Sequence, residues 1–585
     1  MHSQHVMDGN SVLVSHARRP ASQDPLYLHG AERPRICDLS SMAKPSPYSI
    51  HTLVPVLLAV LALLKRRTFP RSSRLHRLLS YVPSARHLPL VYLAFLALYY
   101  HDRGIGTRRS PKTVRFGAYP LIGNLPSVFR RRERQYDFLL DGMRQSEGVT
   151  SITFPFRRFF FLRTPEQIAH VLKTHFDNYI KGPHIYHTLH DVLGNGIFNT
   201  DGDVWRFQRK TASHVFNVRI FRELVEGVFK EESARVVQIL ERAADQQADI
   251  DLQRLFFCFT LDSFGRLSFS KSFRCLENPD APIPFAVSFD YAQGVLDHRF
   301  TNPFWRITEF LSGTQRRFQE AVGVLNDFCY EIIRDRRKES AEHRGARKHD
   351  LLDMFMDYRD ERGEALSDRQ LRDVVINFII AGRDTTAQQL SWQYLRLMEQ
   401  PEVQQRLYEE LMANGDKLSY DSIKSLSYAM ATFNETLRLH PPVPLNMKQV
   451  ARDDVLPDGT VVKEGEMICF STYCLGRDER IWGEDAEEFK PERWLERDRE
   501  GNVVGVLKVP PSQFPVFHMG PRTCLGQQFA TLESLTLSFY LLKRFRFEFS
   551  PRHYEIEAAA GDTPRYGISL TLPMRRPLLA RVYRR

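Results

Sequence analysis

The stretch FHMGPRTCLG, residues 517–526, surrounds one cysteine, Cys524, with two glycines, an arginine and a leading phenylalanine. Gly520 and Gly526 permit close backbone approach and positive φ angles, and Arg522 supplies a cation. The following LGQQFATLESLTLSFYLLKRF is typical of a helix, so the cysteine is expected near a helix N-terminus, where the dipole favours a negative sulfur. The pattern predicts either an inert core thiol or a thiolate held by a positive partner.

A cysteine protease or acyltransferase is the rival interpretation of Cys524. It requires a histidine base, and His518 is near in sequence, but it is one of 20 histidines and no local protease signature surrounds the cysteine. The seven cysteines are scattered singly, without a CxxC pair. This usage is typical of a reducing compartment and disfavours a disulfide scaffold, a structural zinc site and a dithiol redox centre.

A long helix is predicted from Ser367 onward. Ser367 and Gln370 form a capping-box pattern, and apolar residues then recur at helical spacing. The centre reads AGRDTT (381–386), in which a glycine and two threonines are poor helix formers. The Thr385 hydroxyl can bond to the Ala381 carbonyl one turn earlier and loosen the helix there. Taken alone, such residues more often indicate a packing adjustment than an active site.

Two further segments carry charged groups at helical spacing. In FNETLRLHPP, Glu435 and Arg438 lie three residues apart; such pairs usually mark a solvated face, but the apolar neighbours indicate partial burial. In DGDVWRFQRK, Trp205 and Arg209 lie four residues apart. They could hold an anionic group through their N–H donors, or they could form the edge of an amphipathic helix.

The N-terminal hundred residues differ from the rest. Residues 1–47 are predicted to form a disordered leader. Residues 49–64, SIHTLVPVLLAVLALL, carry no ionised side chain, and residues 65–86 hold seven Lys or Arg and no Asp or Glu. We therefore expect a membrane span at 48–64, a basic cytosolic linker, and an interfacial segment at 88–100. The alternative is that both apolar runs are buried helices of a soluble domain.

The formal net charge of +11 is compatible with nucleic acid, an anionic membrane or an acidic protein partner. Nucleic acid is disfavoured because the basic stretch adjoins lipid-like sequence rather than stacking aromatics. The chain of 585 residues exceeds one ordinary domain. We expect residues 48–114 to form a membrane anchor and residues 115–585 to form one large catalytic domain.

Together these pieces resemble the cytochrome P450 superfamily of haem-thiolate monooxygenases. The family's cysteine pattern F-x-x-G-x-R-x-C-x-G is complete at Phe517, Gly520, Arg522, Cys524 and Gly526. Three more motifs occur in family order: A-G-x-D-T-T in AGRDTT, E-x-x-R in ETLR, and P-E-R in FKPERW. The resemblance covers about residues 115–580 and implies a mainly α fold with a small β-rich lobe.

The resemblance implies haem b as the cofactor. Cys524 is similar to the axial thiolate of the haem iron, whose electron donation favours O–O cleavage. Trp205, Arg209 and Arg522 look like holders of the haem propionates. Where the family commonly has a further arginine for a propionate, this chain has Lys448, a cation without the guanidinium fork.

Roles for the other motifs follow from the same resemblance. Asp384 and Thr385 resemble the acid and alcohol that deliver protons to dioxygen, with Gly382 leaving room for it. A buried network that secures the cysteine loop is implied at Glu435, Arg438 and Arg493, with Phe517, Gly520 and Gly526 as loop supports. A histidine that related sequences often carry is replaced by Gly476.

The implied activity is insertion of one oxygen atom of O2 into a C–H bond. Phrases such as GNGIFNTDGDVW and LRLHPPVPLN look closest to the fungal alkane and fatty-acid hydroxylase branch, which predicts terminal or near-terminal hydroxylation of a long-chain lipid. The alternatives are a sterol, terpenoid or aromatic xenobiotic substrate, and more remotely a non-catalytic haem-binding protein. Electrons are expected from NADPH through a separate cytochrome P450 reductase, with cytochrome b5 as a further donor, at the cytosolic face of the endoplasmic reticulum.

Overall fold

The computed structural model of the protein describes residues 87–585, apart from 111–113, 147, 340–349, 361 and 417. Residues 96–585 form one compact unit, and the described residues 87–95 lie outside it. The expected leader, span and basic linker (1–86) therefore lie outside the described residues.

The apolar segment expected at 88–100 forms the helix α3 (Leu88–Tyr99). Its Leu90, Leu93 and Leu98 side chains are more than half exposed. At about 1.5 Å per residue, these 12 residues extend for about 18 Å, less than the roughly 30 Å of a bilayer's hydrocarbon core. Among the residues that the structure describes, no helix is long and apolar enough to cross a membrane.

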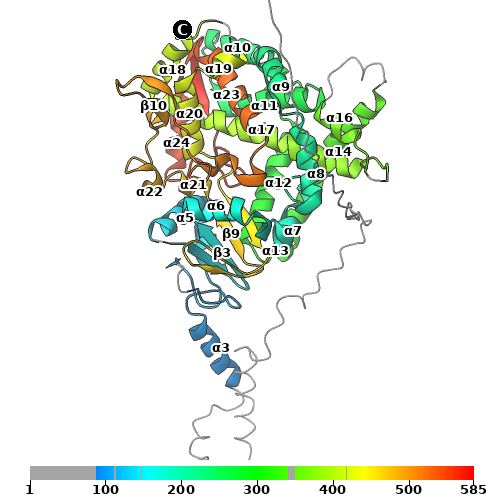
Figure 1. Ribbon diagram of the computed structural model, residues 1–585, viewed down its shortest axis with the longest axis vertical. Helices are drawn as coiled ribbons and strands as arrows, with labels where there is room; N and C mark the ends of the chain where they lie inside the picture. Colours follow the sequence, from blue (N-terminus) through cyan, green and yellow to red (C-terminus); the bar gives the residue numbers. More distant parts are fainter. Residues whose placement is uncertain (1–86, 111–113, 147, 340–349, 361, 417) are drawn as a thin grey trace, which may run out of the picture. The chain divides into compact units, whose positions relative to one another are not determined.

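Helices form most of the unit 96–585 (Figure 1). In chain order they are α4 (Leu125–Arg130), α5 (Gln135–Arg144), α6 (Pro165–Ala169), α7 (Gly182–Leu193), α8 (Gly202–Ser213), α9 (Val218–Glu223), α10 (Phe229–Asp245), α11 (Leu252–Phe269), α12 (Pro284–Thr301), α13 (Trp305–Leu311), α14 (Thr314–Lys338), α16 (Leu351–Met356), α17 (Asp368–Glu399), α18 (Pro401–Ala413), α19 (Tyr420–Ile423), α20 (Ser427–Leu439), α21 (Thr472–Leu475), α22 (Glu479–Trp482), α23 (Gln527–Leu542) and α24 (Pro551–Ala560).

The strands form small sheets beside this helical body. The largest is mixed and has the strand order β1 (Val114–Arg115), β2 (Thr150–Phe154), β3 (Arg157–Leu162), β9 (Met467–Phe470), β6 (Asn446–Val450), β4 (Tyr179–Ile180). Strands β3 and β9 pair in parallel with Phe160 opposite Ile468, which joins segments three hundred residues apart. The predicted mainly α fold with a small β-rich lobe is confirmed.

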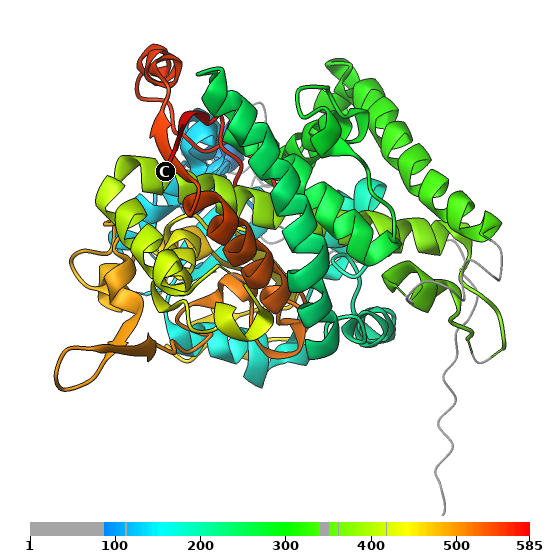
Figure 2. The same ribbon diagram turned by 90° about the horizontal axis from the view of Figure 1, so that it is seen from above.

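The other sheets have two or three strands. They are β7 (Asp454–Val455) with β8 (Val461–Val462), β10 (Leu495–Arg497) with β11 (Val503–Val506), and the order β12 (Phe545–Phe549), β13 (Leu579–Arg584), β5 (Ile250–Asp251). Seen from above in Figure 2, the β10–β11 hairpin, in orange, projects from the margin of the body.

The predicted long helix is confirmed as α17, which runs through the middle of the body (Figure 1). The capping box between Ser367 and Gln370 is present in full. The helix packs against α11, α14, α20 and α23, so that it is buried nearly all round. The Thr385 hydroxyl donates to the Ala381 carbonyl at 2.8 Å, as expected, yet the helix continues without interruption through AGRDTT.

Gly382 is required by the packing of α17 against α11. A Cβ at this position would overlap with the ring of Phe264 on α11. The space beside Gly382 is therefore filled by an aromatic side chain, which corrects the expectation that this glycine leaves room for dioxygen. Its absent side chain instead allows the two helix axes to approach closely.

We expect Gly382→Ala to lower the stability of the protein by about 1–3 kcal/mol, because the added methyl group overpacks a filled interface. The measurement is the thermal unfolding midpoint, followed by circular dichroism. Gly294→Ala is the matched control, since Gly294 lies inside α12 and its Cβ would meet nothing within 4 Å. Equal midpoints for the two variants would contradict the packing role of Gly382.

Candidate functional site

The cysteine loop enters the helix α23 from two short 3-10 turns, Pro515–Phe517 and Gly520–Arg522. The Cys524 N–H donates to the Phe517 carbonyl at 2.8 Å, which closes the loop and turns the thiol outward. Cys524 is exposed, whereas the other described cysteines are buried. The loop therefore presents one accessible sulfur directly before a helix N-terminus, as predicted.

The two glycines of the loop have different functions. Gly520 has φ of 65°, and a Cβ there would overlap with the Leu172 carbonyl oxygen, so only glycine fits. Gly526 has φ of −85°, which any residue can adopt, and the expected positive φ is wrong for this position. A Cβ on Gly526 would lie 3.8 Å from the Cys524 Sγ atom, so the glycine keeps one side of the sulfur open.

The thiol of Cys524 lies in a low-dielectric setting. Desolvation by the surrounding protein raises its pKa, while the backbone N–H groups of Gly526 and Gln527 and the charge of Arg209 act in the opposite direction. The sulfur is accessible all the same, and a cation bonded to it would stabilise the thiolate further than these donors do. Such a cation is what a metal centre supplies.

A cluster of cations lies beside the loop. Its members are Lys181, Lys448 and Arg522, and the neutral His518 and the carboxylate of Asp201 lie among them. Burial, with the neighbouring Lys181 and Arg522 charges, holds the pKa of Lys448 well below its ordinary value. The Lys448 side chain is 2% exposed, and its Nζ atom has no hydrogen-bond partner among the described residues. A buried, unpartnered ammonium group among like charges is a site for an anionic ligand.

Desolvation affects the other members of this cluster in the same way. It lowers the pKa of Lys181 to about 8, with a further contribution from Arg522. It lowers the pKa of Arg522 to about 10, despite the nearby Asp201. It also holds the pKa of His518 well below its ordinary value, so that His518 is neutral at physiological pH. Each of these groups is more stable beside an added negative charge.

Trp205 and Arg522 are brought together as predicted. The Arg522 guanidinium lies 4.4 Å from the centroid of the buried Trp205 indole and donates to the Thr200 carbonyl at 2.7 Å and to Asp201 at 2.8 Å. The loop before α8 is also hydrogen-bonded to α17, since the Asn195 N–H donates to the Asp373 carboxylate at 2.8 Å. Arg209, one turn after Trp205, is part-buried, and its charge acts on the Cys524 thiol.

On the helix α17, Asp384 is held between two donors. Arg383 donates to its Oδ1 at 2.7 Å, and Gln293 of α12 donates to its Oδ2 at 2.8 Å. Desolvation raises the pKa of Asp384 to about 6 against the opposing Arg383 charge. The Thr385 hydroxyl bonds to Ala381, and no direct hydrogen bond between Asp384 and Thr385 occurs in the described part of the chain. The predicted acid and alcohol are therefore adjacent but separately held.

The predicted support network forms around the fully buried carboxylate of Glu435. Arg438 donates to it through two nitrogens, at 2.7 and 2.8 Å, and Arg493 donates at 2.9 Å. The Trp494 indole N–H and the Lys490 backbone N–H each donate at 2.8 Å. Because every lone pair of this carboxylate has a donor, its burial is compensated.

Arg438 connects this network to the neighbouring loops. Its guanidinium also donates to the carbonyls of Gly476, Ala486 and Glu488. A Cβ on Gly476 would overlap with the Arg438 carbonyl oxygen, so the histidine common in related sequences has no space at this position. The absence of a side chain at Gly476 thus allows its backbone to lie close to that of Arg438.

A separate apolar cavity of about 110 Å³ lies between the large sheet, α5 and the end of α12. Its polar members are few, and no lysine, arginine or histidine is among the described residues that line it. Desolvation raises the pKa of Asp297, which faces this cavity from α12, to about 7, while a hydrogen bond from Gln135 acts in the opposite direction. The other lining residues are Val128, Tyr136, Phe138, Leu139, Ile152, Phe154, Phe159, Phe161, Phe300, Thr301, Leu445, Met447, Cys469, Ser569 and Leu570.

Several of these site residues were missed by sequence reasoning. Lys181, Gln293 and Asp297 belong to no motif, and their importance depends on burial and on neighbours from distant segments. His518 was considered only as the base of a protease, whereas it lies among cations that exclude its protonation. A cation next to glycine in YIKGP was the only local signal for Lys181.

A mainly helical body, an accessible cysteine at a helix N-terminus and an adjoining cation cluster define the haem-thiolate class of protein. A family model described as Cytochrome P450 matches residues 115–560. Cytochrome P450 monooxygenase cyp1 of Mycosarcoma maydis is 37% identical over 527 residues, covering 86% of this chain and 82% of that protein. Cytochrome P450 86B1 of Arabidopsis thaliana is 35% identical over 506 residues, covering 82% and 87%. The chain belongs to the cytochrome P450 family, and its enzyme class is that of the monooxygenases.

The described residues fit the haem that this family implies. Cys524 offers an accessible sulfur that a cation would stabilise as a thiolate, and the buried Lys448 Nζ atom needs an anion; haem supplies the first through its iron and the second through its propionates. Arg522, Trp205 and Lys181 adjoin the same cluster. Cys524 is thus the residue that would bind the iron, with Lys448 and Arg522 beside the carboxylates.

We expect Lys448→Met to leave the haem-free protein at least as stable as the parent but to speed haem loss about tenfold or more, because a charge-assisted hydrogen bond of about 1.5–3 kcal/mol is removed. Transfer of haem to excess apomyoglobin, followed in the Soret band, measures the rate. Lys463→Met is the control, since Lys463 is a surface lysine paired with Asp453. Identical rates for the two variants would remove Lys448 from the haem site.

Proposed function

We propose that this cytochrome P450 hydroxylates long-chain lipids, fatty acids or n-alkanes, at or near the chain terminus. The observation that carries the proposal is the apolar cavity lined by aromatic rings and by Leu445, Ser569 and Leu570. These three belong to the segments PPVPLN (441–446) and GISLTLP (567–573). The cavity, at about 110 Å³, is smaller than the roughly 300–1,000 Å³ of ligand pockets, so it would receive part of an alkyl chain, whose burial contributes about 0.8 kcal/mol per CH₂ group.

Asp297 is the acidic residue that faces this cavity, and its ionisation determines the charge there. Its carboxyl group faces apolar side chains, and no cation among the described lining residues is placed to pair with a fatty-acid carboxylate. With a pKa of about 7, Asp297 is largely ionised at pH 8 and repels a second carboxylate, whereas at pH 6 it is protonated and can donate a hydrogen bond. The neutral alkane is therefore the favoured substrate at alkaline pH.

The bound haem supplies oxygen activation, and the protein supplies protons and exclusion of water. In this proposal Asp384, whose carboxyl pKa is raised to about 6 by burial, takes up a proton and releases it again, and Thr385 presents a hydroxyl oxygen that is free to accept a hydrogen bond because its hydrogen is donated to Ala381. Because the two groups are not directly bonded, a water molecule would have to connect them. Gln293 and Arg383 fix the carboxyl group in place.

The proposed electron source is NADPH through a separate cytochrome P450 reductase, with cytochrome b5 as a further donor. Arg206 and Lys210 are exposed on α8, on the same helix as Trp205 and Arg209. Exposed cations at this position support docking of a partner that has an acidic surface. Attraction between the opposite charges speeds association at low ionic strength. No nucleic-acid partner is proposed.

The proposed location is the endoplasmic reticulum membrane, with the catalytic unit in the cytosol. The exposed leucines of α3 support contact with lipid, as does α13, on which Ile307, Phe310 and Leu311 are more than half exposed. Large apolar side chains gathered on one short helix are typical of a membrane or protein contact.

The substrate proposal is tested with dodecane, laurate and a steroid, in the presence of reductase and NADPH, with products identified by mass spectrometry. We expect both lipids to be hydroxylated, dodecane being preferred at pH 8, and the ratio of laurate to dodecane turnover to rise several-fold from pH 8 to pH 6 because Asp297 takes up a proton. In Asp297→Asn we expect a ratio that does not change with pH. Turnover of the steroid alone would overturn the lipid assignment, and the same pH dependence in the variant would overturn the function of Asp297.

The proton-delivery proposal is tested with Thr385→Ala and with Thr385→Ser, which retains the hydroxyl. We expect the alanine variant to form about half as much product per NADPH oxidised, or less, because a positioned hydroxyl group of the proton relay is lost, while the serine variant stays near the parent. Peroxide release and NADPH consumption are measured together with product. If the alanine variant couples as well as the parent, Thr385 has no function in proton delivery.

A further inference from the structure

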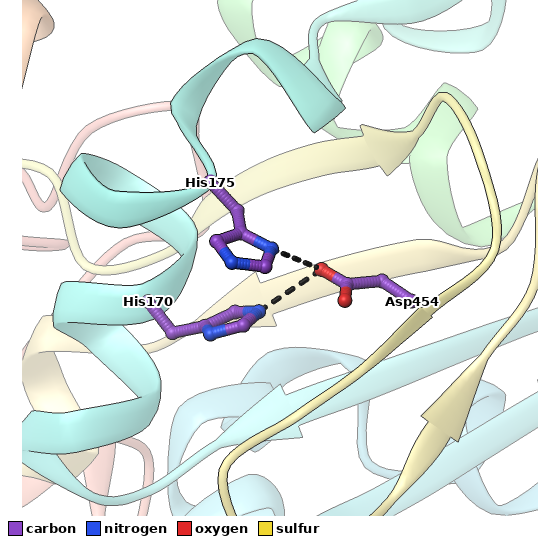
Figure 3. A group of neighbouring side chains, drawn as sticks. All are labelled: His170, His175 and Asp454. Carbon is purple, nitrogen blue, oxygen red and sulfur yellow. Dashed lines mark hydrogen bonds and ion pairs between the residues drawn. The ribbon is translucent and has the colours of Figure 1, made fainter.

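Two histidines and an aspartate lie close together at the surface. They belong neither to the cysteine loop nor to the motifs described above. They are His170, His175 and Asp454, and their ligand atoms all lie within 4.8 Å of one another (Figure 3). His170 Nε2 lies 2.9 Å from the Asp454 Oδ2 atom, and His175 Nδ1 lies 3.0 Å from the same oxygen. Both rings face the carboxylate, as Figure 3 shows.

The conformation of the local backbone brings the two histidine rings together. In an α-helix of about 3.6 residues per turn, side chains five residues apart point to different faces. Residues His170–Thr174 instead form a π-turn after α6, closed by a hydrogen bond of 2.8 Å from the His175 N–H to the His170 carbonyl. This wider turn places residues five apart one above the other, and the ring centroids are 4.0 Å apart.

Several hydrogen bonds hold the Asp454 carboxylate in one orientation. Three donors converge on Asp454 Oδ2, since the Tyr179 hydroxyl also donates to it at 2.8 Å. Tyr179 therefore fixes the orientation of the Asp454 carboxylate from a third side.

We propose that His170, His175 and Asp454 form a binding site for a divalent transition metal ion, for which Zn²⁺ is the fitting probe. Two imidazoles and a carboxylate are a ligand set that zinc accepts, whereas Mg²⁺ and Ca²⁺ prefer oxygen ligands throughout. Tyr179 stays hydrogen-bonded to Asp454 and orients it, as outer-shell groups of metal sites do.

Metal binding requires an adjustment of the three ligand atoms. Ligand atoms that lie about 2.0–2.2 Å from a tetrahedral zinc ion are separated by about 3.3–3.6 Å, so the two N···O distances must widen by a few tenths of an ångström, and the two imidazole nitrogens, which lie within 4.8 Å of each other, must reach the same separation. His175 can move because its side chain is 43% exposed, whereas His170 and Asp454, at 12% and 13%, form the fixed side of the site. The same exposure gives the ion a path from solvent and leaves a position for water.

Metal binding here would act on the segment beside the haem loop. The ion would join the turn 170–175 to β7, and the same turn carries the Leu172 carbonyl against Gly520. Binding is therefore expected to stabilise the contact that seats the cysteine loop. The site is independent of the proposed lipid substrate, because none of its residues lines the cavity.

The test uses the haem-loaded full chain without an affinity tag, freed of loose metal with a chelator, and titrated with ZnCl₂ and with MgCl₂ by calorimetry. We expect one zinc ion per chain with an affinity that His175→Asn lowers about tenfold or more, and no comparable binding of magnesium. Asparagine can still donate to Asp454, so this variant separates metal binding from hydrogen bonding. His214→Asn, which changes an exposed histidine after α8, is the control and should bind zinc like the parent.

Two further measurements distinguish a built site from scattered surface histidines. X-ray absorption at the zinc edge should show two imidazole nitrogens in the parent, and zinc should raise the thermal unfolding midpoint of the parent but not that of His175→Asn. The Soret spectrum of each variant checks that it is folded and loaded with haem. Equal zinc affinity in the parent and His175→Asn would overturn the proposal and leave the cluster as a hydrogen-bonded junction, as would an absence of zinc binding in the parent.

Discussion

The buried carboxylate of Glu435 is the interaction on which the haem side of this protein depends. A charge with no access to water is tolerated only because two guanidinium groups, an indole and a backbone N–H all donate to it. These donors come from α20, from Lys490 and from the short 3-10 helix Pro491–Trp494. Trp494 then packs at 4.8 Å on Phe514, just before the cysteine loop.

Much of this arrangement could be predicted from short motifs. The Ser367 capping box, the Thr385 hydroxyl bonded one turn back, and the pairing of Glu435 with Arg438 all involve residues close in sequence, so their geometry follows from helix periodicity. The family pattern around Cys524 also indicated an accessible thiol near a helix N-terminus, and the structure has this arrangement.

What could not be predicted depends on contacts between distant segments. Gly382 was interpreted from its place in a motif, but the ring of Phe264 on another helix decides its function. The importance of Lys448 also depends on distant segments. Its Nζ atom has no hydrogen-bond partner among the described residues, and the charges of Lys181 and Arg522, from two other segments, act on it. The two sites also differ in charge: cations gather where haem carboxylates belong, while the cavity presents the single carboxyl group of Asp297. Such a contrast is invisible in a net charge of +11.

The wide turn at residues 170–174 has a consequence for chain length. A turn that closes between residues five apart contains one residue more than an α-helical turn needs. Deleting that residue would leave composition and hydropathy almost unchanged, but the side chains that follow it in this turn, up to His175, would rotate by about 100° about the helix axis. The carbonyl beside Gly520 and the start of β4 would both lose their places. At this point the number of residues is therefore under as strict a constraint as their identity, and related chains that differ here in length must seat the cysteine loop by other contacts.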